Sequence, residues 1–196
     1  MKDKSKIPSF ETERLILRAV ELSDADAYKK HFVDYEVIRY LSSLVPWPYP
    51  EHGVHDFIKN VIIPNQGQGR WVWGIFLKDE PQELIGCIDL WKEGKPEHRG
   101  FWLAKKHWSK GIMTEAMPPI LSYAFDSLGF EELIFANAVG NVASRRIKEK
   151  TGCEFIKITK AKYVDPKFTE QELWKLTREQ WAKNYNTPTD DYKSIL

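Results

Sequence analysis

Short apolar runs rich in branched and aromatic residues alternate along this chain with amphipathic segments that begin at capping residues. Residues 14–20 have the length and apolar content of a strand, and Ser23 and Asp24 then predict the start of a helix that runs to about residue 34. Alternate prolines at 46–50 exclude a helix there, because proline lacks an N–H donor. The next predicted elements are a short apolar segment at 37–41, a helix at 51–62, a hairpin of 70–78 with 83–92, and a strand at 97–104.

In the second half, helical and strand-like segments take turns. The pattern predicts a helix from the turn at Gly111 to about 127, where Pro118-Pro119 indicates either a kink or a later start. The further elements are a strand at 133–139, a helix at 141–150, and strands at 155–163 and 172–178. This order predicts an α/β (α+β) fold with a mixed, mostly antiparallel central sheet of about seven strands flanked by about four helices. We expect one domain over 1–196, with a core of about 10–182 and a polar tail at 184–196 that frays.

Composition narrows the function classes. The 196 residues carry a formal net charge of +1, with both signs mixed along the chain, which argues against nucleic-acid binding. No basic-then-apolar start and no apolar stretch of about 18 residues is present, so a cytoplasmic protein without a membrane span is expected. Cys87 and Cys153 are expected to be reduced core thiols, and His52 with His55 lacks a third ligand in view, so no metal is expected.

The turn from His107 to Ala116 is the strongest candidate for chemistry. It follows a strand-like segment and opens a helix through Gly111. Helix starts present unpaired N–H groups and the positive end of the helix dipole, which favours a bound anion such as a phosphate. Asn141-x-x-Ser144 follows about thirty residues later, just past another predicted strand.

Together with Glu149-Lys150-Thr151-Gly152-Cys153, these motifs resemble the GNAT N-acetyltransferases of the RimJ/RimL type. The resemblance extends along the chain from residues 10–15 to Trp174. The resemblance implies a GNAT-like sheet and a single N-acetyltransferase domain that uses acetyl-CoA. The family's pyrophosphate contacts correspond to the backbone amides of Trp108, Ser109, Lys110, Gly111, Ile112, Met113 and Thr114. Trp108 and Met113 depart from the superfamily pattern, and Pro118-Pro119 replaces ordinary helix formers.

The same resemblance assigns further roles. Trp102, Leu103 and Ala104 correspond to the strand that pairs with the pantetheine arm, and an amide near Leu103 would stabilise the oxyanion. Asn141 would contact the coenzyme, although it is equally a good helix cap. Ser144 would protonate the leaving thiolate, because one helical turn places it beside Asn141.

The general base and the acceptor pocket are less defined by the sequence. Asp89 and His98, on adjacent predicted strands, are the candidate bases, either of which could instead be a surface polar residue. Glu115 is a weaker candidate because its place in the first helical turn has a dipole explanation. Trp47 and Tyr49 correspond to the family's acceptor-pocket loop, with loop packing as the alternative.

The resemblance favours one acceptor, a protein N-terminal α-amine such as that of a ribosomal protein. An α-amine of pKa about 8 is partly neutral at pH 7, so it needs less help than a lysine of pKa about 10.4. The alternatives are a small-molecule amine (a polyamine, amino acid or antibiotic) and a catalytically silent acyl-CoA-binding module. A homodimer is plausible for the family.

Overall fold

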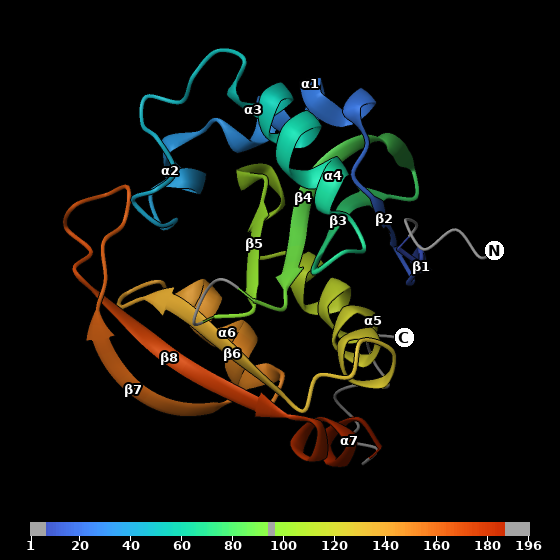
Figure 1. The fold of residues 1–196 in the computed structure, drawn as a ribbon, viewed down its shortest axis with the longest axis vertical. Helices are drawn as coiled ribbons and strands as arrows, with labels where there is room; N and C mark the ends of the chain where they lie inside the picture. Colours follow the sequence, from blue (N-terminus) through green and yellow to red (C-terminus); the bar gives the residue numbers. More distant parts are fainter. Residues whose placement is uncertain (1–6, 94–96, 187–196) are drawn as a thin grey trace.

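Two β-sheets form the framework of the protein. The computed structural model describes residues 7–93 and 97–186. The first sheet is antiparallel in the order β1-β2-β3-β4-β5, made of β1 (Phe10–Glu11), β2 (Leu15–Ala19), β3 (Arg70–Leu77), β4 (Glu80–Trp91) and β5 (Arg99–Leu103). The second has the order β6-β8-β7, made of β6 (Glu132–Ala138), β7 (Glu154–Lys160) and β8 (Glu170–Thr177). Figure 1 shows the second sheet inclined to the first, with β5 and β6 as the facing strands.

The predicted mixed fold with mostly antiparallel strands is confirmed, with one difference in the sheet. The predicted central sheet of about seven strands is divided, within the described residues, between five strands and three. The two sheets meet at His98, whose backbone N–H donates to the Ile134 carbonyl at 2.8 Å. Beyond this point β5 and β6 belong to separate sheets, so backbone groups of both strands face a gap.

Helices cover both sheets and connect their strands (Figure 1). Before β3 they are η1 (Leu22–Asp24), α1 (Ala25–Phe32), α2 (Tyr35–Ile38), α3 (Gly53–Phe57), the π-helical turn η2 (Ile58–Ile62) and α4 (Ile63–Asn65). After β5 they are η3 (Lys105–His107), α5 (Ile112–Asp126), α6 (Val142–Lys150) and α7 (Arg178–Asn186). The predicted helix at 51–62 is thus two consecutive pieces, α3 and η2, which continue into α4, and α7 was not predicted. Residues 184–186 of the predicted tail belong to α7, and 187–196 lie outside the described residues.

The two faces of the first sheet pack against different helices, because successive strand side chains point to opposite faces. On one face, Trp73 and Ile75 of β3 join a core with Met117 and Leu121 of α5. On the other, Val72, Phe76 and Trp102 join a second core whose helical members are Tyr28, Phe32, Val37, Ile38, Val54, Ile58 and Ile62. Packing on both faces fixes the end of β5, where the candidate site begins.

Pro118 and Pro119 lie inside α5, which begins at Ile112 and continues to Asp126. Of the two alternatives for Pro118-Pro119, a kink or a later start, the later start is therefore wrong. Proline disrupts a helix least in the first turn, and both prolines lie beyond the first turn of α5. The backbone amides of that first turn therefore keep regular helical geometry. Met117 and Ile120 on either side are fully buried, which indicates that tertiary packing compensates for the lost backbone hydrogen bonds.

Glu83 of β4 joins three segments, and its charge predicts an acid-sensitive contact. Its carboxylate accepts from Lys30 at 2.9 Å, from His31 at 2.5 Å and from Lys106 at 3.2 Å. Hydrogen bonds from Lys30 and His31 lower the pKa of Glu83 to about 2. A lowered folded-state pKa stabilises the fold above the unfolded value of about 4.3, and the contribution is lost as pH falls towards about 2.

We therefore expect Glu83→Gln to lower the free energy of unfolding at pH 6 and to have a much smaller effect near pH 2.5, where little of the contribution remains. Urea unfolding at several pH values measures both. Glu179→Gln, an exposed change on α7, is the control and should be neutral throughout. A loss of stability in Glu83→Gln that is equal at all pH values would contradict the role of the charge.

Candidate active site

A cavity of about 620 Å³ lies between the facing strands β5 and β6 and extends to the starts of α5 and α6. Its size is typical of a small-molecule site. It is lined by Val37, Tyr40, Leu41, Arg99, Gly100, Phe101, Trp102, Leu103, His107, Trp108, Ser109, Gly111, Ile112, Met113, Thr114, Ala136, Asn137, Gly140, Asn141, Val142, Ala143, Ser144, Arg146, Ile147 and Lys150. The structure thus brings most of the predicted coenzyme residues to one cavity. Ala104 and Lys110 are not among the described residues that line it.

The start of α5 forms one end of the cavity and has the geometry of an anion site. Gly111 is the N-cap, with φ 76°, a left-handed conformation that glycine adopts without the steric cost of a side chain. The Glu115 N–H donates to the Gly111 carbonyl at 3.0 Å, the first bond of the helix. The N–H groups of Ile112, Met113 and Thr114 therefore have no acceptor within the helix. Thr114 does not cap this helix, because Gly111 already takes that position.

The turn before α5 is held by the Trp108 side chain. Its indole N–H donates to the Leu103 carbonyl at 2.7 Å, which ties the turn to the end of β5. Ser109 next to it has φ 61°, an uncommon conformation for a residue other than glycine. Such backbone conformations persist where the surrounding structure holds them, and they are frequent at ligand sites.

Glu115 supports the turn from behind. Its carboxylate accepts from the Thr12 hydroxyl at 2.5 Å, from the Arg14 N–H at 2.8 Å and from the Arg14 Nε at 2.7 Å. Arg14 also donates to the Lys110 carbonyl at 3.1 Å. Burial alone would raise the pKa of Glu115, but the Thr12 and Arg14 contacts outweigh it and the pKa is lowered. Glu115 is thus a charged structural link rather than a free base.

Backbone groups of β5 point into the gap between the sheets. Two residue pairs on β4 and β5 or beside them are hydrogen-bonded. The Ala104 N–H donates to the Ile85 carbonyl at 2.8 Å, and the Trp91 N–H donates to the His98 carbonyl at 3.0 Å. Because such pairs alternate along an antiparallel ladder, Leu103 occupies a position that is not bonded to β4. Its N–H therefore points away from β4 towards the cavity. This is the direction required of an amide that stabilises an oxyanion.

Asn141 and Ser144 open helix α6 on the opposite wall. The Asn141 Oδ1 accepts from the Ser144 N–H at 3.1 Å, so Asn141 caps the helix as the alternative interpretation held, and it also lines the cavity. Ser144 is 7% exposed and its hydroxyl lies 2.9 Å from Nζ of Lys148. The sequence prediction identified Ser144 but assigned no role to this lysine.

The structure does not bring the two candidate bases, Asp89 and His98, to the cavity. Asp89 forms an ion pair with Arg70, which lines a separate cavity of about 510 Å³. The His98 Nδ1 accepts from the Ile134 N–H at 2.9 Å where the two sheets meet. Burial lowers the pKa of His98, which keeps this nitrogen available as an acceptor. Both side chains therefore have structural contacts, and neither is among the described residues that line the main cavity.

Trp47 and Tyr49 also lie outside that cavity lining. Trp47 packs against Tyr35 with ring centroids 5.3 Å apart, and Tyr49 meets the edge of Phe32 at 5.4 Å. Loop packing, the alternative interpretation, thus describes their contacts. The wall on this side is formed by α2 and the residues after it, namely Val37, Tyr40 and Leu41. Sequence reasoning missed these residues, because a short apolar segment gives no sign of the cavity it faces.

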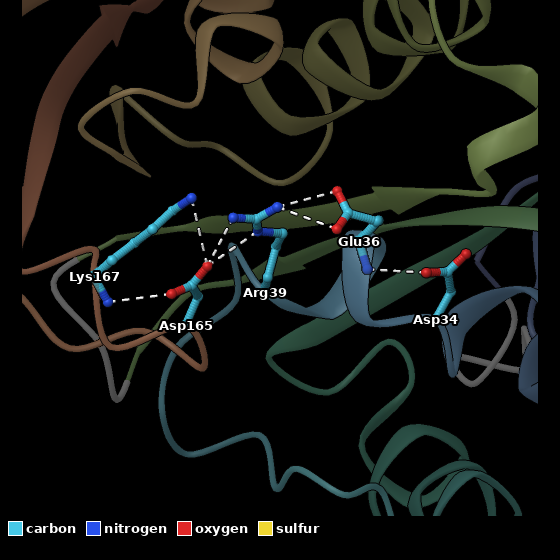
Figure 2. A network of polar contacts seen from close by, with 5 residues as sticks. All are labelled: Asp34, Glu36, Arg39, Asp165 and Lys167. Atoms are coloured by element: carbon cyan, nitrogen blue, oxygen red, sulfur yellow. Dashed lines mark hydrogen bonds and ion pairs between the residues drawn. The ribbon is translucent and has the colours of Figure 1, made fainter.

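An ion-pair network holds α2 against the connection between β7 and β8 (Figure 2). Arg39 donates to Asp165 at 2.8 Å and to Glu36 at 3.1 Å, and the Glu36 N–H donates to Asp34 at 2.9 Å. Burial would raise the pKa of Asp165, but the Lys167 N–H and Arg39 outweigh it and the pKa is lowered. The network ties α2, which packs on the first sheet, to a connection of the second sheet, so the cavity has a fixed wall at this end.

The cavity lining is cationic and lacks carboxylates. Arg99, Arg146 and Lys150 contribute cationic side chains, and none of the described lining residues is Asp or Glu. This composition, next to the free amides of α5, suits a phosphate-bearing molecule. Across the described ranges no group of three or more His, Cys, Asp or Glu side chains could hold a metal ion. None of the described helices is long and apolar enough to cross a bilayer.

Comparison with known proteins agrees with this arrangement. Residues 14–154 match the Acetyltransferase (GNAT) domain. The chain is 31% identical over 148 residues to the uncharacterized N-acetyltransferase YoaA of Bacillus subtilis, covering 74% of this chain and 82% of YoaA. It is 25% identical over 189 residues to the FsC-acetyl coenzyme A-N(2)-transacetylase of Aspergillus fumigatus, covering 90% of this chain and 79% of that protein.

Solved structures share the fold at lower identity. The ribosomal-protein-S5-alanine acetyltransferase of Vibrio fischeri aligns with a TM-score of 0.73 at 16% identity, over 89% of this chain and 99% of that one. The matched family domain contains both the α5 turn and the Asn141–Ser144 helix start. This chain therefore belongs to the GNAT acetyltransferases, as an acetyl-CoA-dependent N-acetyltransferase.

Proposed function

We propose that this enzyme transfers acetyl from acetyl-CoA to the α-amino group of a protein N-terminus. The observation that carries the proposal is the composition of the cavity, whose described lining has no carboxylate. Without a carboxylate base, an amine of pKa about 8 reacts more readily at pH 7 than one of about 10.4. Cationic polyamines would also gain little from a basic lining. The Vibrio fischeri enzyme of the same fold, named for the alanine of ribosomal protein S5, agrees with this choice.

In the proposed mechanism each wall of the cavity has one task. Amides of Ile112, Met113 and Thr114 hold the pyrophosphate, and Asn141 contacts the coenzyme. The neutral amine attacks the thioester carbon, while the Leu103 N–H stabilises the oxyanion. Collapse of this intermediate breaks the C–S bond, and the Ser144 hydroxyl protonates the departing sulfur. The acceptor nitrogen releases its extra proton to water, and the serine oxygen regains a proton before the next turnover.

A panel of acceptors tests the proposal, with thiol release as the readout. We expect turnover with short peptides that have a free N-terminus, and none with the same peptides carrying a blocked N-terminus and a free lysine. Spermidine and single amino acids complete the panel. Turnover confined to these small amines would replace the proposed acceptor.

A small-molecule acceptor is the second candidate, favoured by the Aspergillus relative that matches 90% of this chain and is named for an N(2) acceptor. A silent acyl-CoA-binding protein is the third outcome of the panel. It would show a raised melting temperature with acetyl-CoA and no thiol release from any amine.

A further inference from the structure

Lys148 is a fully buried lysine whose polar contacts lead to the proposed acid. It lies on α6, one turn after Ser144, and its side chain has 0% exposure. Its Nζ is 2.9 Å from the Ser144 Oγ and 3.5 Å from the Ser144 carbonyl oxygen. Burying an ammonium costs several kcal/mol unless its partners compensate. A lysine at such a place is a candidate for a function in the reaction.

The surroundings of Lys148 on the packed elements are mostly apolar or of the same charge. Arg99 of β5 is 5% exposed, and its Nε and Nη2 have no hydrogen-bond partner among the described residues. Cys153 follows α6, and Glu172 of β8 is already bonded to Asn137. Burial and the Arg99 charge lower the pKa of Lys148 well below its usual range, despite the opposing effects of Cys153 and Glu172. Lys148 therefore gives up its proton more easily than an exposed lysine does.

The direction of the hydrogen bond determines where the serine proton points. An ammonium has three donors and no acceptor, so it can only donate to the Ser144 Oγ. The hydroxyl hydrogen of Ser144 must then point to a different acceptor. Ser144 lines the cavity, whereas Lys148 is not among the described residues that line it, so an acceptor in the cavity is available to the hydroxyl.

We propose that Lys148 is a positioning residue that directs the Ser144 hydroxyl into the cavity and resupplies the proton that this hydroxyl gives to the thiolate. The inference rests on the proposed role of Ser144. As the C–S bond breaks, sulfur takes the Oγ proton and Oγ takes one from Nζ, which leaves a neutral amine on Lys148. The acceptor nitrogen releases one proton to water when it forms the amide bond. Lys148 takes one proton back from water, through the Ser144 hydroxyl, before the next turnover, so the protons balance without a further reactant.

Lys148→Met separates this role from a structural one. Methionine has nearly the same length, so a well-packed apolar replacement of a buried charge should leave stability unchanged or raise it. We expect kcat to fall about tenfold, with KM for acetyl-CoA within about twofold, because the serine hydroxyl remains but loses its donor. Lys157→Met, an exposed change on β7, should alter neither quantity.

Two further measurements make the test decisive. Lys148→Met combined with Ser144→Ala should be no slower than Ser144→Ala alone, since both act on one step. The ratio of the wild-type kcat to the Lys148→Met kcat should fall towards one as pH rises through the Lys148 pKa, because both enzymes meet the same ionisation of the acceptor amine. An unchanged kcat in Lys148→Met, additive losses in the double variant, or a ratio that instead rises with pH would each overturn the inference.

The choice of acceptor does not affect this test. It is run with any amine that gives thiol release from the wild-type enzyme, and with water as the acceptor in acetyl-CoA hydrolysis. Failure with protein N-termini but success with another amine would overturn the proposed acceptor alone. Equal turnover by the wild type and Lys148→Met with an active acceptor would overturn the role of Lys148 alone.

Discussion

Ser144→Ala is expected to lower kcat about a hundredfold while the Kd for coenzyme A changes less than about twofold, because a general acid acts on the reaction and not on ground-state binding. The cap of α6 survives the change, since Asn141 accepts from the backbone N–H of residue 144 and not from its side chain. The cavity wall thus keeps its shape. Single-turnover thiol release measures the rate, and calorimetric titration measures the binding.

The substitution also leaves the Lys148 ammonium without its nearest acceptor. An unsatisfied buried donor costs about 1–3 kcal/mol, so the assay temperature must lie well below the lowered melting point. Ser127→Ala, an exposed change after α5, is the matched control and should have normal kcat and stability. Turnover at the wild-type rate would remove Ser144 from the mechanism. An equal loss of rate and of coenzyme affinity would indicate a binding role instead.

Glu115→Ala is expected to lower the free energy of unfolding by about 2–3 kcal/mol and to weaken coenzyme binding about tenfold. The carboxylate is 3% exposed and accepts three hydrogen bonds from Thr12 and Arg14, so its loss leaves those donors without an acceptor. Arg14 is 46% exposed and can turn to solvent, which limits the cost. Binding weakens because Arg14 also holds the Lys110 carbonyl in the turn.

Urea unfolding and coenzyme titration measure the two effects. Glu149→Ala is the control, because this glutamate is 47% exposed and pairs with Arg145 on the same helix, a contact that typically contributes less than about 0.5 kcal/mol. Because the pKa of Glu115 is lowered in the folded protein, its contribution to the free energy of unfolding depends on pH. The contribution is present above about pH 4.3 and is lost as pH falls further. A loss of stability with normal coenzyme affinity would separate Glu115 from the turn.

The parts of the site that could be predicted are those in which the chemistry lies within a few consecutive residues. Gly111 with the first turn of α5, and Asn141 with Ser144 at the start of α6, are local patterns whose geometry follows from helix termini and glycine conformation. The strand-then-helix order likewise predicted the mixed fold. The division into two sheets was not predictable, because it depends on β5 and β6 separating after His98.

For a related reason, the sequence could not show that the predicted bases and acceptor residues are absent from the lining of the main cavity. Asp89 and His98 are polar residues on strands, a pattern shared by catalytic and structural side chains. Only the folded chain shows that Asp89 meets Arg70 and that the imidazole of His98 accepts from the Ile134 N–H. Trp47 similarly packs on Tyr35 rather than lining the cavity.

The sequence by itself therefore determined the family, and it predicted the turn before α5 and Ser144 as parts of the site, because backbone amides and caps depend on neighbouring residues. Tertiary structure alone decided what surrounds that serine. Arg99 and Lys148 are far apart in the sequence, and each is an ordinary basic residue in its own segment. Their significance arises when β5 and α6 pack together and remove both charges from water, since the cost of a buried charge depends on every element around it.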